Sequence, residues 1–352
     1  MITCIAGIQQ LGIGIPNVVE AFTWYRRHFG VDVPIFDEAA EANLMLPYTG
    51  GKPHMRRAIL AINMNGGGGF EIWQYTSRTP QPAKFNIQLG DLGVFCGKIK
   101  AKNVAIAHQF LSTKNVPFIT ELLTSPSNQP HFFVKDPYGN WFEIIESEDW
   151  FGNGKYPTGG TAGSIIGVSN MDKSINFYKN LLGYTSVVYD KEGIFDDLKH
   201  LPLGDKKIRR VLLRHPNIRK GAFSKLLGKT EIELIQNYEH TPRKIFENRF
   251  WGDLGFIHMC FDVTNMKEVK SECESFGHPF TVYSGEKFEM GEAGGSFSYI
   301  EDPDGYFIEF VETHKVPILK KLGWYLNLKK RDPEKSLPTW MLKALALGRV
   351  KN

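Results

Sequence analysis

Two stretches of this chain repeat nearly the same sequence: residues 133–146 read FVKDPYGNWFEIIE, and residues 299–312 read YIEDPDGYFIEFVE. In each, an apolar segment leads into an Asp-Pro-x-Gly turn and then into a second apolar segment. Pro at the second turn position and Gly at the fourth favour a type I turn, so both stretches are predicted β-hairpins. One carboxylate, Glu143 or Glu309, interrupts each second strand. Because burying an unpaired charge is costly, each carboxylate needs a partner.

The repetition extends over most of the chain. EIWQ at residues 71–74 matches ELIQ at 233–236, and GDLG at 90–93 matches GDLG at 252–255, both at an offset of 162 residues. Such self-similarity is the mark of a duplicated architecture.

Each copy divides again into a strand, a helix and further strands. Helices are predicted at about residues 17–28 and 103–114, the first with Asn17 and Glu20 as a capping box. The sequence therefore predicts a βαβββ unit that occurs four times, at the following approximate residues: 5–78, 90–148, 161–240 and 252–314.

Length and composition narrow the class of protein. A chain of 352 residues is long enough for two domains, and a net charge of +4 gives no reason to expect a nucleic-acid partner. The sequence has no apolar run of membrane-spanning length and no signal peptide, so a cytoplasmic protein without stable membrane insertion is expected. The four cysteines form no CxxC pair, which indicates reduced thiols.

The duplicated DPxGxxxE string, with the strand–helix pattern before it, resembles the vicinal oxygen chelate superfamily, which includes glyoxalase I, bleomycin-resistance proteins, extradiol dioxygenases and methylmalonyl-CoA epimerase. The resemblance covers residues 5–314. It implies an α+β fold in which two tandem glyoxalase-like domains, residues 1–150 and 160–314, form incomplete β-barrels. A basic helical extension is expected at residues 315–352. The chain is expected to be a monomer or a homodimer.

The resemblance also implies one divalent metal ion (Zn, Ni, Mn or Fe), with up to two ligands from each unit, one on its first strand and one on its last. Side chains on neighbouring strands stand about 4.5 to 5.5 Å apart at Cβ, which is close enough to share an ion. The cation would neutralise the buried carboxylates. The first-strand and last-strand positions of units one to four are respectively these: Gln10 and Glu71, Cys96 and Glu143, Gly163 and Glu233, His258 and Glu309.

The way in which the units pair decides which site is complete. If sequential units pair, the second domain lacks a ligand at Gly163. If the outer units pair, as in the monomeric tandem glyoxalases, Gln10, Glu71, His258 and Glu309 form the Gln/Glu/His/Glu set that glyoxalase I uses. We expect the outer pairing because it alone gives four ligands, and sequential pairing is the alternative. The degenerate second site would then hold the remaining residues, namely Cys96, Glu143 and Glu233.

By this resemblance we expect a metal-dependent isomerase, epimerase or lyase that chelates two adjacent oxygens of a small molecule and transfers a proton. Glu309 is the expected base and Glu71 its counterpart across the ion. Gly14 and Tyr75 stand where glutathione-binding members carry Arg and Asn, so the substrate is not expected to be glutathione-linked. Trp73 and Tyr75 are candidates for substrate binding, with one of the two expected to face away.

Two alternatives stay open. An extradiol or hydroxyphenylpyruvate-type Fe(II) dioxygenase needs a second histidine where Gly163 stands. A metal-free small-molecule binding protein of the resistance type would lack the ligands that this chain keeps.

Overall fold

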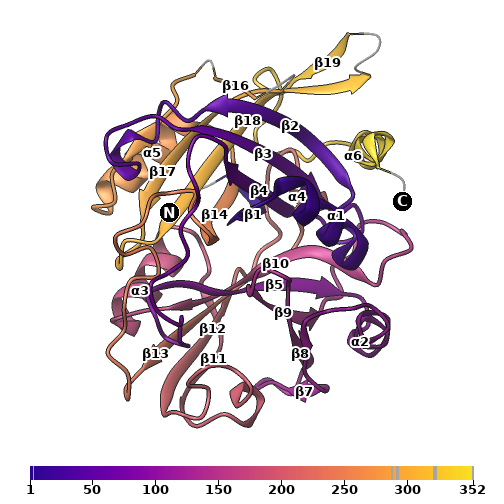
Figure 1. Ribbon diagram of the computed structural model, residues 1–352. Coiled ribbons are helices and arrows are strands. Elements are labelled where there is room, and N and C mark those ends of the chain that lie inside the picture. The colour runs from indigo at the N-terminus through magenta and orange to yellow at the C-terminus, as the bar shows by residue number, and fades with distance from the viewer. Residues whose placement is uncertain (3, 287, 291–292, 320–322, 351–352) are drawn as a thin grey trace.

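The computed structural model describes residues 1–2, 4–286, 288–290, 293–319 and 323–350. It contains two curled, mixed β-sheets with helices packed against them (Figure 1). Units one and three follow the predicted strand–helix–three-strand order, whereas units two and four carry additional short strands before their final hairpins.

The elements of the first half are these: β1 (Ile5–Gly14), α1 (Val18–Phe29), β2 (Val33–Glu41), β3 (Met55–Ile62), β4 (Gly69–Tyr75), β5 (Gly93–Ala101), α2 (Val104–Ser112), β6 (Phe118–Ile119), β7 (Leu123–Thr124), β8 (Pro130–Lys135) and β9 (Trp141–Glu146). Those of the second half are these: β10 (Thr158–Gly167), α3 (Met171–Asn180), β11 (Ser186–Gly193), β12 (Ile208–Arg214), α4 (Ser224–Leu227), β13 (Glu231–Asn237), β14 (Gly255–Val263), α5 (Met266–Ser275), β15 (Val282–Tyr283), β16 (Phe288–Met290), β17 (Ala293–Glu301) and β18 (Phe307–Leu319).

The outer units pair. One sheet runs β15-β17-β18-β14-β1-β4-β3-β2 and joins unit four to unit one; we call it the outer sheet. The other runs β11-β12-β13-β10-β5-β9-β8-β6 and joins unit three to unit two; we call it the inner sheet. In Figure 1 the indigo start of the chain accordingly lies beside its orange and yellow end. Each sheet takes strands from both halves of the chain, so neither sheet corresponds to one sequence repeat. The domain boundaries expected at 1–150 and 160–314 therefore stay a prediction.

Strand register places the four predicted outer ligands near one another. β1 lies antiparallel to β14 with Gln10 opposite Cys260 and Gly12 opposite His258. On either side of this pair a parallel partner brings in a carboxylate, with Glu71 opposite Gly12 and Glu309 opposite Cys260.

Local sequence signals set the helix starts. The side chain of Asn17 accepts hydrogen bonds from the backbone N–H groups of Val19 and Glu20, and its amide donates to Glu20. Asn103 caps α2 and Asn170 caps α3 in the same way. A side-chain acceptor at this position satisfies helix N–H groups that lack an intrahelical partner. The helix start predicted at Asn17 is therefore confirmed, but Glu20 accepts from the side-chain amide of Asn17 and not from its backbone N–H, so the reciprocal bond of a capping box is not formed.

Two buried tyrosines link the sheets. The hydroxyl of Tyr25 on α1 donates to the carboxylate of Asp136 in the turn of unit two at 2.6 Å. Tyr178 on α3 donates to Asp302 in the turn of unit four at 3.0 Å. Each bond joins a helix of one sheet's unit to the hairpin of the other sheet, and one apolar cluster with side chains from both sheets surrounds them.

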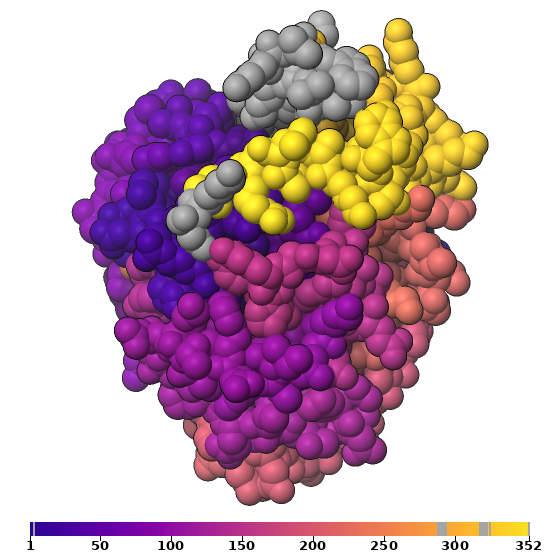
Figure 2. All heavy atoms as spheres, turned by 90° about the vertical axis from the view of Figure 1, so that its right-hand side faces the viewer, coloured from indigo at the N-terminus to yellow at the C-terminus, as the bar shows by residue number. Residues whose placement is uncertain are grey.

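The C-terminal tail is only partly helical. β18 continues to Leu319 and pairs with β19 (Trp324–Asn327), so the tail begins as a strand extension. A short helix α6 (Thr339–Ala344) and a 3-10 turn (Leu345–Gly348) follow. Leu337 and Leu342 are buried in one apolar cluster with Val33 and Ile62 of unit one and Leu226 of unit three. Figure 2 shows this yellow segment lying across the indigo and magenta parts of the chain. Among the helices built by described residues, none is both long and apolar enough to span a bilayer.

The Tyr178 hydrogen bond gives a stability prediction. The Tyr178→Phe variant leaves one oxygen of buried Asp302 without its hydroxyl donor, so we expect the free energy of unfolding to fall by about 1–3 kcal/mol. Urea denaturation followed by circular dichroism measures this. The control is Tyr238→Phe, whose exposed hydroxyl bonds to Glu192 and should change stability by less than about 0.5 kcal/mol. Equal stability of the two variants would show that the sheet-to-sheet bond contributes nothing.

Candidate metal centre

Glu71, His258 and Glu309 form a buried cluster in the outer sheet, with one ligand atom of each within 4.8 Å of the others. The Nε2 atom of His258 lies 3.0 Å from Glu309 Oε2 and 3.3 Å from Glu71 Oε2. The amide of Gln10 donates to Glu309 Oε2 at 3.4 Å. The structure therefore brings the four predicted outer residues together on one face of four adjacent strands.

A glycine makes room for the imidazole. A Cβ atom at Gly12 would lie 2.3 Å from His258 Cε1, so any larger residue would displace the ring. On the opposite side the hydroxyl of Tyr299 lies 3.5 Å from His258 Nδ1. Contact with the second ring nitrogen is the usual way in which a ligating histidine is oriented.

The electrostatics of the cluster fit a cation. Burial acts to lower the pKa of His258, but the carboxylates of Glu309 and Glu71 raise that pKa to about 9. The Oε1 atom of Gln10 is buried and has no hydrogen-bond partner among the described residues. An amide oxygen, two carboxylates and an imidazole are donors that divalent ions such as Zn, Mn, Fe and Ni accept. The residues present therefore fit the implied metal ion.

Aromatic side chains surround the cluster. Trp73 contacts Trp251 edge to face with centroids 4.3 Å apart, and Trp251 lies parallel to the His258 ring at 5.9 Å. Tyr75 donates its hydroxyl to the backbone carbonyl of Trp251. The expectation that Trp73 or Tyr75 faces away was wrong, because residues two apart on a strand share a face and both side chains are buried.

In the inner sheet a lysine side chain occupies the space between the carboxylates. Glu143 and Glu233 come together as predicted, but the ammonium of Lys98 lies between them, 2.9 Å from Glu143, 2.5 Å from Glu233 and 2.8 Å from Glu231. Lys98 is 2% exposed. The cation that these carboxylates need is thus supplied by the chain itself.

Cys96 and Gly163, the two first-strand positions of the inner sheet, offer no metal ligand beside Glu143 and Glu233. Cys96 is fully buried, its thiol points to the carbonyl of Gly97 at 3.5 Å, and burial raises the pKa of that thiol. Gly163 has a positive φ and its Cβ position lies 1.7 Å from the carbonyl oxygen of Glu231, so no side chain fits.

Further ion pairs close the inner network. Arg210, fully buried, contacts Glu233 and lies 2.6 Å from Asp197. His131 bridges Glu143 at 2.7 Å and Asp197 at 3.2 Å. Because every acidic group in it has a basic partner, the inner site is an internal salt-bridge network.

Sequence reasoning missed the basic members of this network. Lys98 lies two residues after Cys96 on a strand, so it faces the same side, and this spacing could have revealed it. Tyr299 could also have been found, since the hairpin turn fixes it opposite Glu309. His131 could have been found in the same way, because it is the diagonal neighbour of Glu143 in the predicted hairpin. Nothing in the spacing indicates its second partner, Asp197, or the contacts of Arg210.

Comparison with protein-family models gives a match over most of the chain. The family model described as "Glyoxalase/Bleomycin resistance protein/Dioxygenase superfamily" matches residues 7–144 and 161–310. No curated protein sequence matches the chain.

Two solved structures are similar in fold. A "putative dioxygenase" from Bacillus subtilis subsp. subtilis str. 168 has a TM-score of 0.57 at 14% identity, covering 88% of this chain and 86% of its own. A variant of glyoxalase I from Zea mays has a TM-score of 0.51 at 14% identity, covering 87% of this chain and 93% of its own. At this identity the likeness concerns the fold.

The inner network predicts a large stability effect at Lys98. The Lys98→Met variant leaves three buried carboxylates without their shared ammonium, and we expect a loss of about 3–5 kcal/mol in the free energy of unfolding. Lys102→Met, at an exposed position four residues later, is the matched control and should be nearly neutral. A Lys98→Met protein as stable as the control would contradict the assignment. Urea denaturation provides the measurement.

His131 predicts a pH dependence. Burial lowers its pKa, but hydrogen bonds to Asp197 and Glu143 raise that pKa to about 9, above the ordinary value of 6.5. Its contribution to stability is therefore fully present below pH 6.5 and is lost as the pH rises through 9. The stability difference between wild type and His131→Gln should shrink by roughly 3 kcal/mol over that range. A difference that stays constant with pH would show that His131 is not charged in the folded state.

Proposed function

Because the chain belongs to the glyoxalase/bleomycin resistance protein/dioxygenase superfamily, we propose that it is a divalent-metal-dependent enzyme of the glyoxalase type. Its working site is the outer cluster of Gln10, Glu71, His258 and Glu309. The reaction is a proton transfer on a small substrate with two adjacent oxygens, which makes the protein an isomerase, epimerase or lyase.

The observation that carries this proposal is the convergence of the four side chains from opposite ends of the chain. Gln10 and Glu309 are 299 residues apart in sequence, yet their side chains are within hydrogen-bond reach. The side-chain oxygen of Gln10 is buried without a partner. Two carboxylates share one imidazole, so the negative charge of this site exceeds its positive charge and a bound cation would balance it. The inner site, by contrast, already has its cation in Lys98.

A divalent ion bound there would polarise a substrate carbonyl and acidify the neighbouring C–H bond. Glu309 takes the proton at a carboxylate oxygen, and Glu71 is the matching group for its return on the other side. Gln10 steadies Glu309 through its amide, and Tyr299 holds the imidazole of His258. The buried rings of Trp73 and Trp251 keep water from this side of the site.

The substrate proposed is not glutathione-linked. At Gly14 a Cβ atom would lie 1.9 Å from the carbonyl oxygen of Asp253, so the backbone approach excludes a cationic side chain there. Tyr75 is tied to the carbonyl of Trp251 and offers no amide. Trp73 is the better candidate for contact with the apolar part of a substrate. Cytoplasmic location and a monomeric or homodimeric state stay predictions.

The alternatives fit less well. An Fe(II) dioxygenase site needs two histidines and one carboxylate, and the outer cluster contains one histidine. His131 on the inner sheet is engaged by Glu143 and Asp197. A metal-free binding protein is distinguished by the metal content of the purified chain.

The Glu309→Gln variant tests the proposed base. Purified without chelator, wild type should contain about one equivalent of a divalent metal, and Glu309→Gln should retain most of it, because the amide oxygen still donates. Turnover should fall by roughly 10²–10⁴-fold, the usual contribution of a general base. Elemental analysis gives the metal content. Assays with 2-oxo acids, acyl-CoA thioesters, hemithioacetals and catechols, each with Mn, Fe, Ni and Zn, give the activity.

Two variants complete this experiment. His258→Ala should lose the metal, whereas His131→Gln, at the histidine of the inner network, should keep it. An anomalous-scattering peak at the outer cluster would give independent support. Metal that remains bound in His258→Ala, or undiminished turnover in Glu309→Gln, would contradict the proposed site or the proposed base, respectively.

A further inference from the structure

Two basic segments lie side by side on this protein, away from the candidate metal centre. Residues 215–230, around α4, contain four Lys or Arg and no acidic residue, and residues 323–350 of the tail contain six Lys or Arg and two acidic residues. With histidine counted as neutral, the two segments together carry a net charge of +8, whereas the whole chain carries +4. The rest of the chain is therefore net negative. We call the two segments the basic surface.

Hydrogen bonds and an ion pair hold the two segments together. The N–H of Gly221 donates to the carbonyl of Glu334 at 3.2 Å, and the N–H of Leu337 donates to the carbonyl of Ala222 at 2.9 Å. The ammonium of Lys220 lies 2.8 Å from the carboxylate of Glu334. The basic surface is therefore one continuous part of the folded protein, and Figure 2 shows its tail segment, in yellow, across the exposed face.

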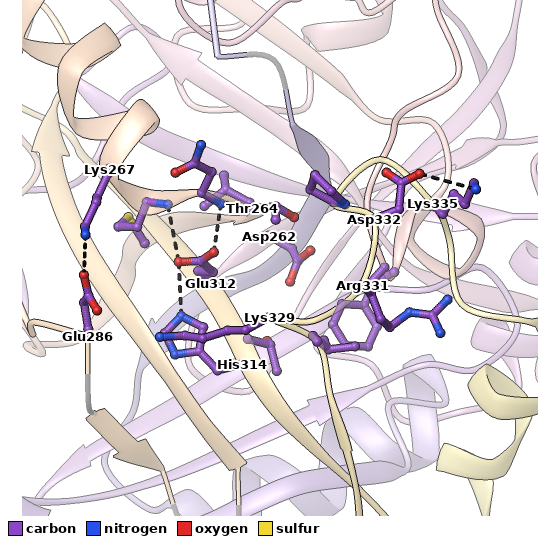
Figure 3. A pocket seen from close by; sticks show the side chains of 18 of the residues that line it. Asp262, Thr264, Lys267, Glu286, Glu312, His314, Lys329, Arg331, Asp332 and Lys335 are labelled. Carbon is purple, nitrogen blue, oxygen red and sulfur yellow. Dashed lines mark hydrogen bonds and ion pairs between the residues drawn. The ribbon is translucent and has the colours of Figure 1, made fainter.

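The acidic residues of the basic surface are already paired. Glu334 pairs with Lys220, and Figure 3 shows Asp332 paired with Lys335, at 3.4 Å. Other exposed cations form no ion pair with any described residue, namely Lys225, Lys330 and Lys343. The basic surface therefore keeps an excess of positive charge after internal pairing.

These cations do not converge on one point. Figure 3 shows the side chains of Lys329 and Arg331 pointing in opposite directions. Lys225 and Lys343 come from two different helices, α4 and α6. A small anion would contact one or two of these groups, whereas an extended array of negative charges contacts many of them at once. The distribution of charge therefore fits a broad anionic surface.

The basic surface also exposes apolar side chains. Trp340 is 58% exposed and Leu347 is 76% exposed, and with Lys343 they lie on the side of the helical tail opposite the buried Leu342. Ile218 in the other segment is 87% exposed. Nucleic-acid phosphates offer no apolar partner for aliphatic side chains. The interface of a lipid bilayer accommodates Trp and aliphatic side chains next to lysines.

We propose that the basic surface docks the protein on an anionic phospholipid membrane. Trp340 and Leu347 enter the interfacial layer, and the exposed lysines pair with the phosphates and carboxylates of the lipid headgroups. The contact is peripheral and inserts no helix across the bilayer. It does not depend on the proposed function, since no residue of the candidate metal centre belongs to either segment.

Co-sedimentation of the full chain with phospholipid vesicles tests this proposal. We expect binding to phosphatidylcholine vesicles that contain about 30% phosphatidylserine and little binding to pure phosphatidylcholine vesicles. Raising NaCl from about 0.1 M to about 0.5 M should weaken binding by about tenfold or more, because salt screens exposed charges. Trp340→Ala should weaken binding by about fivefold or more, because its ring no longer enters the interface.

A pair of charge-matched variants assigns the surface. The double variant Lys225→Glu with Lys343→Glu should lose about tenfold or more in affinity for the anionic vesicles. The control is Lys199→Glu with Lys207→Glu, two exposed positions between β11 and β12, at the lower end of Figure 1 and away from α6. It removes the same charge and should bind within about twofold of wild type. Circular dichroism confirms that each variant is folded.

Glu309→Gln should bind vesicles normally, which separates this proposal from that of the metal centre. The proposal is overturned if phosphatidylserine does not increase binding, if the two double variants lose affinity equally, or if Trp340→Ala binds like wild type. Binding to a single-stranded RNA oligonucleotide in place of vesicles would identify a nucleic-acid surface and would also overturn it.

Discussion

The antiparallel pairing of β1 with β14 is the contact on which the candidate site depends. It joins the first unit to the fourth, and it places Gly12 opposite His258 with no side chain between them. The parallel partners β4 and β18 then bring Glu71 and Glu309 to the same face. Without this pairing, the amide, the imidazole and the two carboxylates would lie in different sheets, and none of the chemistry proposed above could occur.

The two sheets solve one physical problem in two ways. Carboxylates on buried strands need a counter-charge, whichever sheet they are in. In the inner sheet Lys98, Arg210 and His131 provide the counter-charge, so the network leaves no ligand position open. In the outer sheet the corresponding strand position to Lys98 is Cys260, a thiol whose pKa burial raises further. The outer carboxylates therefore stay available to an exchangeable cation, and under the proposed function the duplication has separated a structural copy from a catalytic one.

The same separation of roles extends to the rest of the chain. The Tyr25–Asp136 and Tyr178–Asp302 bonds use the first Asp of the two repeated DPxG turns to hold one sheet against the other. The tail extends the outer sheet through β19 before it crosses the first unit.

The sequence by itself determined the repeat, the turns, the capped helices and the strand positions of Gln10, Glu71, His258 and Glu309, because these depend on spacing along the chain and on the alternation of side chains in a strand. Only the tertiary structure decided that unit one pairs with unit four and that Lys98 fills the inner site. These contacts join residues far apart in sequence, and a buried charge reveals which partner satisfies it only when the strands are in place.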